Sequence, residues 1–444
     1  MKSLIQVFFL LVFTGCTSSS ETNWSFLPSV NGNWEIVNVF GGTQEDIAHG
    51  ISFTADGGVI IVGNTQSTNG DFSDKNRPGS DIFLMKLNSE FDLEWTQTYG
   101  GSDDDRGHGV IQLSDGGYAA IGYSKSDDGD ASLNQGQHDN WIIRTDAQGS
   151  LLWQKSFGFL GHDHAYNIIA TSDGGLFFNG FLDVTASNGE GQDGKHRMGS
   201  AKHGVGEFWC HKLDFDGNLQ WRRYFGGTSN DRSYDAIQTK EGDFVLAGSS
   251  ESQDIDISNP KGGYDLWVVK IDSKGNLLWE RSLGGSEYDI GKAIIETFSG
   301  EYLIAGQSTS QDKDISKFYG GSDGLLVRLS SNGELVQTLN LGDEGFDTLN
   351  DLVQRPDGTL VAIGHSGSDQ METVAPNNDV ILYYTLANGA ILSKHRLGGE
   401  GLDLAEAITM NSKGDLIVVG STESTSGLFS NSKGGKDLFV AVWN

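Results

Sequence analysis

The hydrophobic and polar positions follow the pattern of short antiparallel strands. Short strand-like segments such as residues 109–113 recur along the chain, and segments such as residues 265–270 are interpreted as alternating strands. Turn sequences such as Asp115-Gly116-Gly117 separate these segments. Alternation with a period of two is typical of half-buried strands, and Asp-Gly pairs tolerate the positive φ of tight hairpin turns. The pattern predicts antiparallel sheet along the whole chain after about residue 33.

One unit of four such strands recurs seven times. Each unit opens on a glycine and has an aspartate five residues later, and its second strand ends on another glycine. The opening glycines are Gly41, Gly100, Gly158, Gly226, Gly284, Gly342 and Gly398, at intervals of 59, 58, 68, 58, 58 and 56 residues. The aspartates are Asp46, Asp105, Asp163, Asp231, Asp289, Asp347 and Asp403. Recurrence at this period is typical of a repeat architecture.

The two ends of the chain complete each other. The seventh unit stops at Asn444 after its third strand, while residues 34–40 precede Gly41 as a fourth strand precedes the other opening glycines. An N-terminal strand that completes a C-terminal sheet closes a ring without an open edge, whereas a solenoid would need capping units. We therefore predict an all-β fold, a seven-bladed β-propeller of four-stranded antiparallel blades over residues 33–444, closed by the N-terminal strand.

This closure makes the strand after each repeated aspartate the innermost one. Two residues after the aspartate, six of the seven positions carry small residues, as crowding near the axis requires: Ala48, Gly107, Ala165, Ser233, Gly291, Leu349 and Ala405. The next column is His49, His108, Tyr166, Tyr234, Lys292, Asn350 and Glu406. We expect these side chains to line the channel or its mouth, and His49, His108, Tyr166 and Tyr234 are candidate ligand-binding residues.

The N-terminal segment has the pattern of an export signal. Lys2 precedes a short apolar run at residues 4–13, too short for a permanent membrane helix. The ending Phe13-Thr14-Gly15-Cys16 resembles the lipobox of bacterial lipoproteins, with Phe13 where leucine is usual. The resemblance implies a signal peptide at residues 1–16, lipid on Cys16 and a tether at 17–32. We then expect a protein of the bacterial cell envelope, held by its lipid at the outer membrane. The alternative is an ordinary secretory signal with an incidental cysteine.

The net charge disfavours one class of partner, and the cysteine content argues against a disulfide framework. The formal charge is −30 and is spread along the chain, which disfavours nucleic acid and favours solubility and cation binding. Besides Cys16 the chain has one cysteine, Cys210, so we expect it to be a buried apolar residue rather than part of a disulfide framework. We expect a monomer.

Acidic residues provide candidate sites of two kinds. The sevenfold aspartate and a second acidic column before the third strands are best explained as fold determinants, because a catalytic group need not occur seven times. The loops between second and third strands contain Asp-x-Asp-x-Ser sequences. Their acidic residues are Asp128, Asp130, Asp254, Asp256, Asp312 and Asp314. Alternating oxygens suit calcium, whereas Asx turns explain the same short runs equally well.

The third unit departs from the repeat. It is about ten residues longer, and the excess falls in residues 183–206, which include His196, Arg197 and His203. Loops recruit ligand contacts, so these three residues are binding candidates, and a longer solvent loop is the alternative. His162, His164, His196, His203 and His211 also lie in this unit, but their spacing matches no closed zinc signature, which argues against a metal site there.

The repeats carry a family resemblance. Asp173-Gly174-Gly175, Gly275-Asn276-Leu277-Leu278-Trp279 and Leu283-Gly284-Gly285 resemble a class of bacterial β-propeller-repeat lipoproteins, some of which are labelled endoglucanase-like. The resemblance spans residues 33–444, and its motifs are structural, so it implies the fold and no chemistry.

Three functions remain open. The leading expectation is a membrane-tethered, non-catalytic binding or scaffolding propeller that contacts a polysaccharide or a protein, since the chain carries no nucleophile elbow, phosphate loop or dinucleotide fingerprint. The alternatives are a carbohydrate-active enzyme with its site at the channel mouth or under the third-blade insertion, and a structural surface protein stabilised by Ca²⁺.

Overall fold

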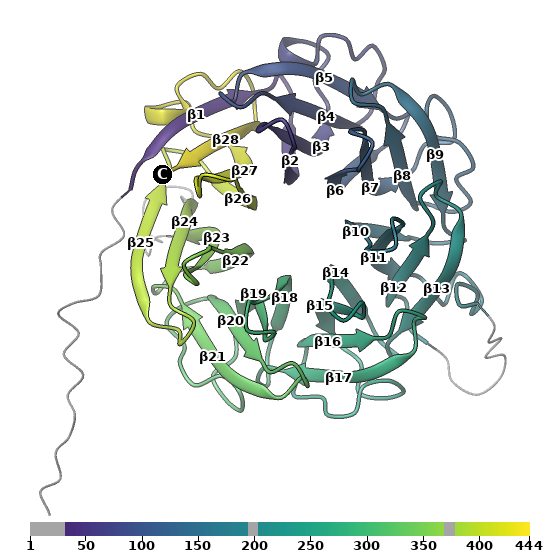
Figure 1. The fold of residues 1–444 in the computed structure, drawn as a ribbon, viewed down its shortest axis with the longest axis vertical. Coiled ribbons are helices and arrows are strands. Elements are labelled where there is room, and N and C mark those ends of the chain that lie inside the picture. Colours follow the sequence, from purple (N-terminus) through teal and green to yellow (C-terminus); the bar gives the residue numbers. More distant parts are fainter. Residues whose placement is uncertain (1–31, 194–202, 368–377) are drawn as a thin grey trace, which may run out of the picture.

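The computed structural model describes residues 32–193, 203–367 and 378–444. In this part of the chain, 28 strands form seven four-stranded antiparallel sheets arranged as the blades of a ring (Figure 1). The predicted seven-bladed β-propeller is therefore confirmed.

In blades 1–6 the four strands follow one another along the chain from the channel outwards. Blade 1 contains β2 (Asp46–Phe53), β3 (Val59–Thr65), β4 (Asp81–Leu87) and β5 (Leu93–Tyr99). Blade 2 contains β6 (Asp105–Gln112), β7 (Tyr118–Ser124), β8 (Asp139–Thr145) and β9 (Leu151–Phe157). Blade 3 contains β10 (His164–Ala170), β11 (Leu176–Leu182), β12 (Glu207–Leu213) and β13 (Leu219–Phe225). Blade 4 contains β14 (Asp231–Gln238), β15 (Phe244–Ser250), β16 (Asp265–Ile271) and β17 (Leu277–Leu283).

The other three blades follow the same plan. Blade 5 contains β18 (Asp289–Glu296), β19 (Tyr302–Ser308), β20 (Asp323–Leu329) and β21 (Leu335–Leu341). Blade 6 contains β22 (Asp347–Gln354), β23 (Leu360–Gly367), β24 (Asn378–Thr385) and β25 (Ile391–Leu397). Blade 7 contains β26 (Asp403–Met410), β27 (Leu416–Thr422), β28 (Asp437–Trp443) and, as its outermost strand, β1 (Trp34–Phe40).

The ring closes as the sequence predicts. β1 pairs antiparallel with β28, from Trp34 opposite Trp443 to Phe40 opposite Leu438. In Figure 1 the purple first strand lies beside the yellow last one. This pairing covers the edge that β28 would otherwise expose.

The core lies between neighbouring blades. The second and third strands of each blade are buried almost along their full length, as in β3 and β4. One cluster joins Ile61 and Phe83 of blade 1 to Val419 and Val440 of blade 7. The outermost strands are much more exposed. Packing of each sheet on the next therefore holds the ring together.

Every innermost strand contains a β-bulge at the same place. In β2 the register shifts between Ala48 and Gly50, so His49 is the extra residue. The recurrent glycine of the second strand lies near its end and opposite this bulge: a Cβ on Gly63 would lie 1.9 Å from the carbonyl oxygen of Ile47. The corresponding distance is 1.8 or 1.9 Å in all six other blades. The recurrent glycine is thus required by the bulge.

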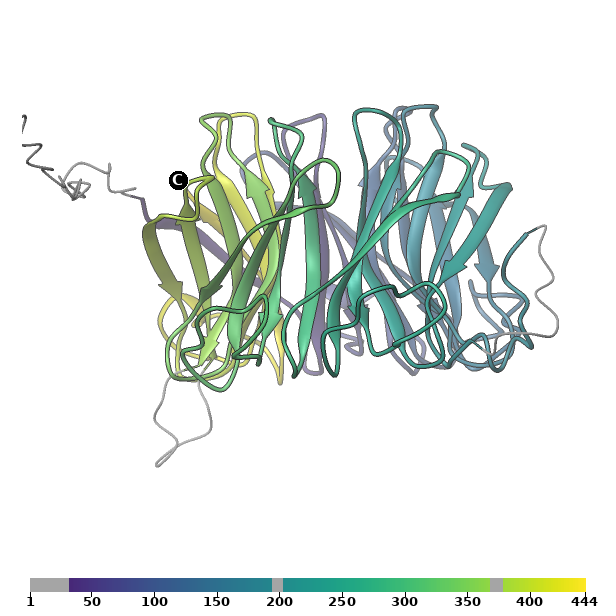
Figure 2. The same ribbon diagram turned by 90° about the horizontal axis from the view of Figure 1, so that it is seen from below.

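The two faces of the ring differ. The loops between second and third strands and the connections between blades lie on one face, here called the loop face, at the lower side of Figure 2. Tight hairpin turns form the other face. Two short 3₁₀ turns, η1 (Gly70–Phe72) and η2 (Gly427–Phe429), lie in loops of the loop face. Across the three described ranges, no helix is long and apolar enough to cross a membrane.

Candidate functional site

The channel contains one candidate residue from each blade. His49, His108, Tyr166, Tyr234, Lys292, Asn350 and Glu406 are the bulged residues of the seven innermost strands. All seven line one cavity of about 200 Å³ on the axis. The repeat therefore brings together residues up to 357 positions apart, because each bulge turns one extra side chain towards the axis.

Four aromatic side chains form one arc of the channel wall. Ring centres are 4.8 Å apart for His49 and His108, 5.1 Å for His108 and Tyr166, and 5.3 Å for Tyr166 and Tyr234. Burial lowers the pKa of His49 to about 4, although a hydrogen bond with Asn64 opposes it. Burial also lowers the pKa of His108. At neutral pH the two imidazoles are therefore uncharged, and the arc offers ring faces together with hydrogen-bonding groups.

The other arc carries charge. The Lys292 ammonium lies 4.5 Å from the centre of the Tyr234 ring, at cation–π distance. Burial raises the pKa of Glu406 to about 7, and the positive charge of Lys292 acts in the opposite direction. Asn350 donates its amide to the carbonyl oxygen of Ala405 at 2.8 Å. The cavity thus combines an aromatic arc with the cation of Lys292 and the carboxyl group of Glu406, and Asp235 and Asp351 also line it.

The residue after the channel column ties neighbouring blades together. Asp235 accepts the backbone N–H of Ile294 in the next blade at 2.8 Å, and Asp351 accepts that of Ile408 at 2.8 Å. Burial raises the pKa of both carboxyl groups to about 7. These two aspartates were not predicted from the sequence. The feature that could have pointed to them is an acidic residue directly after the channel column.

The sevenfold aspartate is part of the fold. Asp105 accepts the backbone N–H of Gly101 and the Ser126 hydroxyl, each at 2.8 Å, and also the Ser124 hydroxyl. Asp46, Asp289 and Asp403 have the same three kinds of donor. Asp163 instead accepts two backbone N–H groups, and burial raises its pKa to about 8. The structural interpretation of this column agrees with these contacts.

The Asp-x-Asp carboxylates contact N–H donors. In blade 2, Asp128 accepts the N–H of Ser102 at 2.7 Å, and Asp130 accepts that of Gly100 at 3.3 Å. Blades 4 and 5 repeat this arrangement, with Asp254 on Thr228, Asp256 on Gly226, Asp312 on Ser286 and Asp314 on Gly284. These contacts join each loop to the segment that opens its own blade, 26 and 30 residues earlier in the chain, and so differ from the local Asx turns of the alternative. Calcium in these loops stays a prediction.

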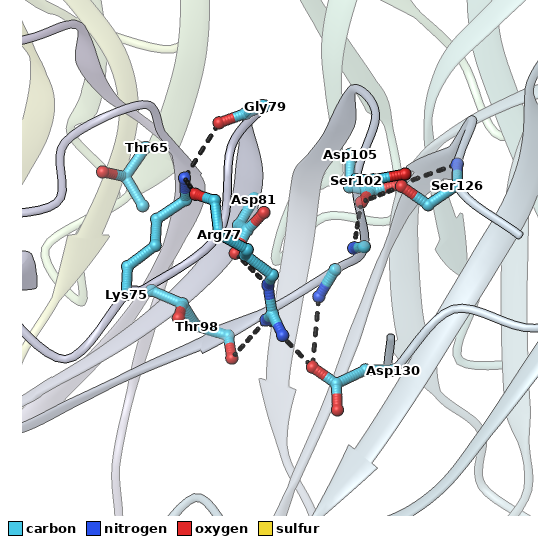
Figure 3. Close-up of polar contacts among 12 residues, drawn as sticks. Thr65, Lys75, Arg77, Gly79, Asp81, Thr98, Ser102, Asp105, Ser126 and Asp130 are labelled. Atoms are coloured by element: carbon cyan, nitrogen blue, oxygen red, sulfur yellow. Dashed lines mark hydrogen bonds and ion pairs between the residues drawn. The ribbon is translucent and has the colours of Figure 1, made fainter. Parts of the chain in front are cut away.

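A cation from the preceding blade reaches an aspartate in three loops between second and third strands: Asp130, Asp314 and, in blade 1, Asp71 of Asn69-Gly70-Asp71. Arg77 of blade 1 binds Asp130 of blade 2 at 2.9 Å and also Asp81 and the carbonyl oxygen of Thr98 (Figure 3). Lys261 lies 3.4 Å from Asp314, and Lys433 pairs with Asp71. These ion pairs link neighbouring loops across blade junctions.

Of the third-blade candidates, His203 is described by the structure, and it does not line the channel cavity. His203 is buried and lies 2.9 Å from Glu207, whose carboxylate also accepts the N–H of Gly204 at 2.8 Å. His203 therefore helps to anchor the long loop at the start of β12. His196, Arg197 and Cys16 lie outside the described residues. Cys210 is a buried free cysteine, as expected, and burial raises the pKa of its thiol to about 12.

Three histidines meet at the junction of blades 2 and 3. The Nδ1 atoms of His138 and His162 are 2.8 Å apart, and Nε2 of His164 is 3.1 Å from Nδ1 of His138. Tyr123 stacks on His164 with ring centres 3.9 Å apart. Burial lowers the pKa of His138, and lowers that of His164 to about 3. Spacing within the third unit could not reveal this cluster, because His138 belongs to the second.

Fold and channel define the class: a seven-bladed β-propeller with a polar, partly aromatic channel. No protein-family model matches the chain. It is similar to the regulatory protein FlaEY of Caulobacter vibrioides, with 23% identity over 414 residues that cover 81% of this chain and 41% of FlaEY. The chain thus spans about two fifths of the length of that relative.

Solved structures with a similar fold have varied functions. The Pan2 WD40 domain of Neurospora crassa has a TM-score of 0.47 at 10% identity and covers 90% of this chain and 89% of its own. Puromycin hydrolase has a TM-score of 0.48 at 11% identity, with coverage of 86% and 51%. A luciferin-regenerating enzyme has a TM-score of 0.38 at 10% identity, with coverage of 83% and 99%. These similarities carry no argument about the activity of this chain.

Proposed function

We propose that this protein is a lipid-anchored, non-catalytic propeller of the bacterial cell envelope whose channel binds a saccharide unit of a polysaccharide. The observation that carries the proposal is the convergence of seven bulged residues, one from each blade, on one axial cavity of about 200 Å³. Each blade contributes one side chain at the same structural position, and these side chains differ in chemistry. The cavity therefore presents different groups around its wall, which suits one asymmetric ligand.

The chemistry of the wall favours a sugar. Faces of His108, Tyr166 and Tyr234 can contact the C–H surface of a sugar ring, while phenol, imidazole and ammonium groups can bond to its hydroxyls. The cavity is smaller than the roughly 300–1,000 Å³ of most drug-sized pockets, so it suits one sugar unit rather than a long stretch of chain. A protein that inserts a side chain is the other class of ligand, and it would leave the glycan array without specific binding.

A glycan array probed with the purified protein tests this proposal. We expect binding to a limited set of polar glycans, and we expect the double variant Tyr166→Ala/Tyr234→Ala to lose it. Tyr319→Ala, which alters an exposed tyrosine on the loop face, serves as the matched control and should bind normally. An array without specific binding, or binding that the channel variant retains, would contradict the proposal.

One observation favours the enzymatic alternative. A carboxyl group with a pKa of about 7, such as Glu406, is protonated in part at neutral pH and could act as a general acid towards a glycosidic oxygen. Reducing-sugar release from the bound glycans distinguishes the two functions. Release that Glu406→Gln abolishes would replace the binding proposal by a glycosidase, whereas we expect none.

The anchor is a separate part of the proposal. It is supported by the lysine, the apolar run and the lipobox-like sequence that ends at Cys16. Cys16→Ser removes the thiol that would carry lipid, so we expect the variant to leave the membrane fraction and appear in the soluble fraction. Membrane association that persists in Cys16→Ser would refute the lipid anchor and leave the channel proposal intact.

A further inference from the structure

The histidine cluster is built on a repeated contact between blades. At six blade junctions a parallel bridge joins one residue of a blade to one residue of the next. The first residue comes directly before a third strand, and the second comes directly before the repeated aspartate of the next blade. The pair at the junction of blades 2 and 3 is His138 and His162. The backbone N–H of Asp163 also bonds to the carbonyl oxygen of His138 at 2.8 Å. These sheet-like hydrogen bonds therefore fix the backbone positions of His138 and His162.

The third histidine follows from strand geometry. His164 lies two residues after His162, so both side chains project from the same side of an extended chain. Three ring nitrogens, one from each histidine, lie within 4.8 Å of one another. Tyr123 stacks on His164, and Phe181 lies 4.9 Å from the same ring, so aromatic contacts hold its orientation. The three imidazoles converge from two neighbouring blades.

Other junctions lack this chemistry. The pairs at the remaining bridges are Glu45 with Lys436, Ser80 with Asp104, Gly206 with Asn230, Tyr264 with Tyr288, and Ser322 with Phe346. Within the described parts of the chain, the three histidines are also the one group of three or more His, Cys, Asp or Glu side chains whose ligand atoms lie this close together. The cluster is therefore a local departure from the repeat and not a requirement of the fold.

We propose that His138, His162 and His164 bind one divalent first-row transition-metal ion, with Zn²⁺ as the representative ion. Imidazole nitrogens suit Zn²⁺, Cu²⁺ and Ni²⁺. Two nitrogens bound to one tetrahedral Zn²⁺ lie about 3.3 Å apart, given Zn–N bonds of about 2.0–2.1 Å. The separations of 2.8 and 3.1 Å from Nδ1 of His138 come close to this value. The nitrogens of His162 and His164 lie within 4.8 Å of each other, so ring rotation that brings these two imidazoles closer completes the site. Since His162 is exposed, the remaining position is open to water or a ligand oxygen.

Calorimetric titration of the purified, untagged protein with Zn²⁺ tests the proposal. Excess Mg²⁺ in the buffer occupies weak sites on the acidic surface. We expect one equivalent of Zn²⁺ to bind. We also expect His162→Gln to weaken binding at least tenfold, since loss of a ligand costs no less than the roughly 10–100-fold caused by loss of an outer-shell partner. His162 is exposed, so this variant should fold normally. His395→Gln, which removes a histidine from β25 of blade 6, is the control and should bind as wild type does.

Co²⁺ gives a second readout that does not depend on affinity. Bound at three imidazoles, Co²⁺ should show visible d–d absorption that His138→Gln and His164→Gln abolish. A wild-type protein that binds neither ion stoichiometrically would overturn the proposal. So would Zn²⁺ binding that is the same in His162→Gln as in wild type.

Discussion

At the scale of residues, the channel column shows how one position acquires a different chemistry in each blade. The bulge places the side chain on the axis whatever its identity, so His49, Tyr234, Lys292 and Glu406 occupy equivalent places. The bulge does not depend on these side chains, because its backbone is set by the glycine opposite. Substitution in this column should therefore change the channel chemistry without breaking the blade.

Glu406 gives a prediction about pH. Its pKa rises from 4.5 to about 7 on folding, so the native state binds more protons than the unfolded state between these values. Stability contributed by Glu406 is then full below about pH 4.5 and falls as the pH rises through 7. Glu406→Gln removes this dependence. The unfolding free energy of the variant minus that of wild type should therefore be larger at pH 8 than at pH 4.5, by up to about 3 kcal/mol.

Urea unfolding of both proteins at the two pH values measures this gain. Comparing differences cancels the contributions of the other buried carboxyl groups and histidines, which both proteins share. Glu35→Gln, at an exposed position of β1, should show no such change between the two pH values. A difference between Glu406→Gln and wild type that does not vary with pH would contradict the assignment.

At the scale of elements, the outer strands and the turns interlock from blade to blade. The turn glycine before β17, Gly275, has φ = +79° and lies against the ring of Trp221 in β13 of the preceding blade. Gly149 on Trp95, Gly217 on Trp153 and Gly333 on Trp279 repeat this contact. The Gly-x-Leu-x-Trp pattern, as in residues 275–279, therefore forms contacts between blades. Its glycine contacts a tryptophan of the preceding blade, and its tryptophan contacts the turn glycine of the next blade.

Gly275→Ala should destabilise the protein for two reasons. A left-handed backbone costs an alanine about 1–2 kcal/mol, and the added Cβ would lie 2.9 Å from the Trp221 ring. Gly242→Ala is the matched control, because Gly242 has φ = +91° but nothing within 4 Å of an added Cβ. In chemical denaturation we expect Gly275→Ala to lose more stability than Gly242→Ala. Equal losses would show that the tryptophan contact contributes nothing.

The elements that the sequence could predict are those encoded within one blade. Strand alternation and the aspartate that accepts hydroxyl and N–H donors act inside a single sheet, so each unit repeats them. Contacts between blades leave a weaker pattern. His138 and His162 are 24 residues apart and belong to different units, and only the packed ring makes them neighbours. Asp235 and Asp351 escaped notice for the same reason, since their N–H donors lie in the next blade.

At the scale of the whole molecule, the ring turns a repeat into a single site. Seven inner strands come close only around a closed axis, and β1 secures that closure by pairing with β28. The loop face carries the histidine cluster and the ion pairs between blades, while the channel passes through the middle. The predicted site residues of the channel column share one cavity, whereas His203 lies apart from it.

The central claim is that this shared cavity binds a saccharide unit. The most direct measurement is a calorimetric titration of the best array glycan into wild type, Tyr166→Ala/Tyr234→Ala and the surface control Tyr319→Ala. Loss of two aromatic contacts should cost about 1–3 kcal/mol, so we predict at least about fivefold weaker binding for the channel variant and unchanged binding for the control. Equal affinity in all three proteins would contradict the claim.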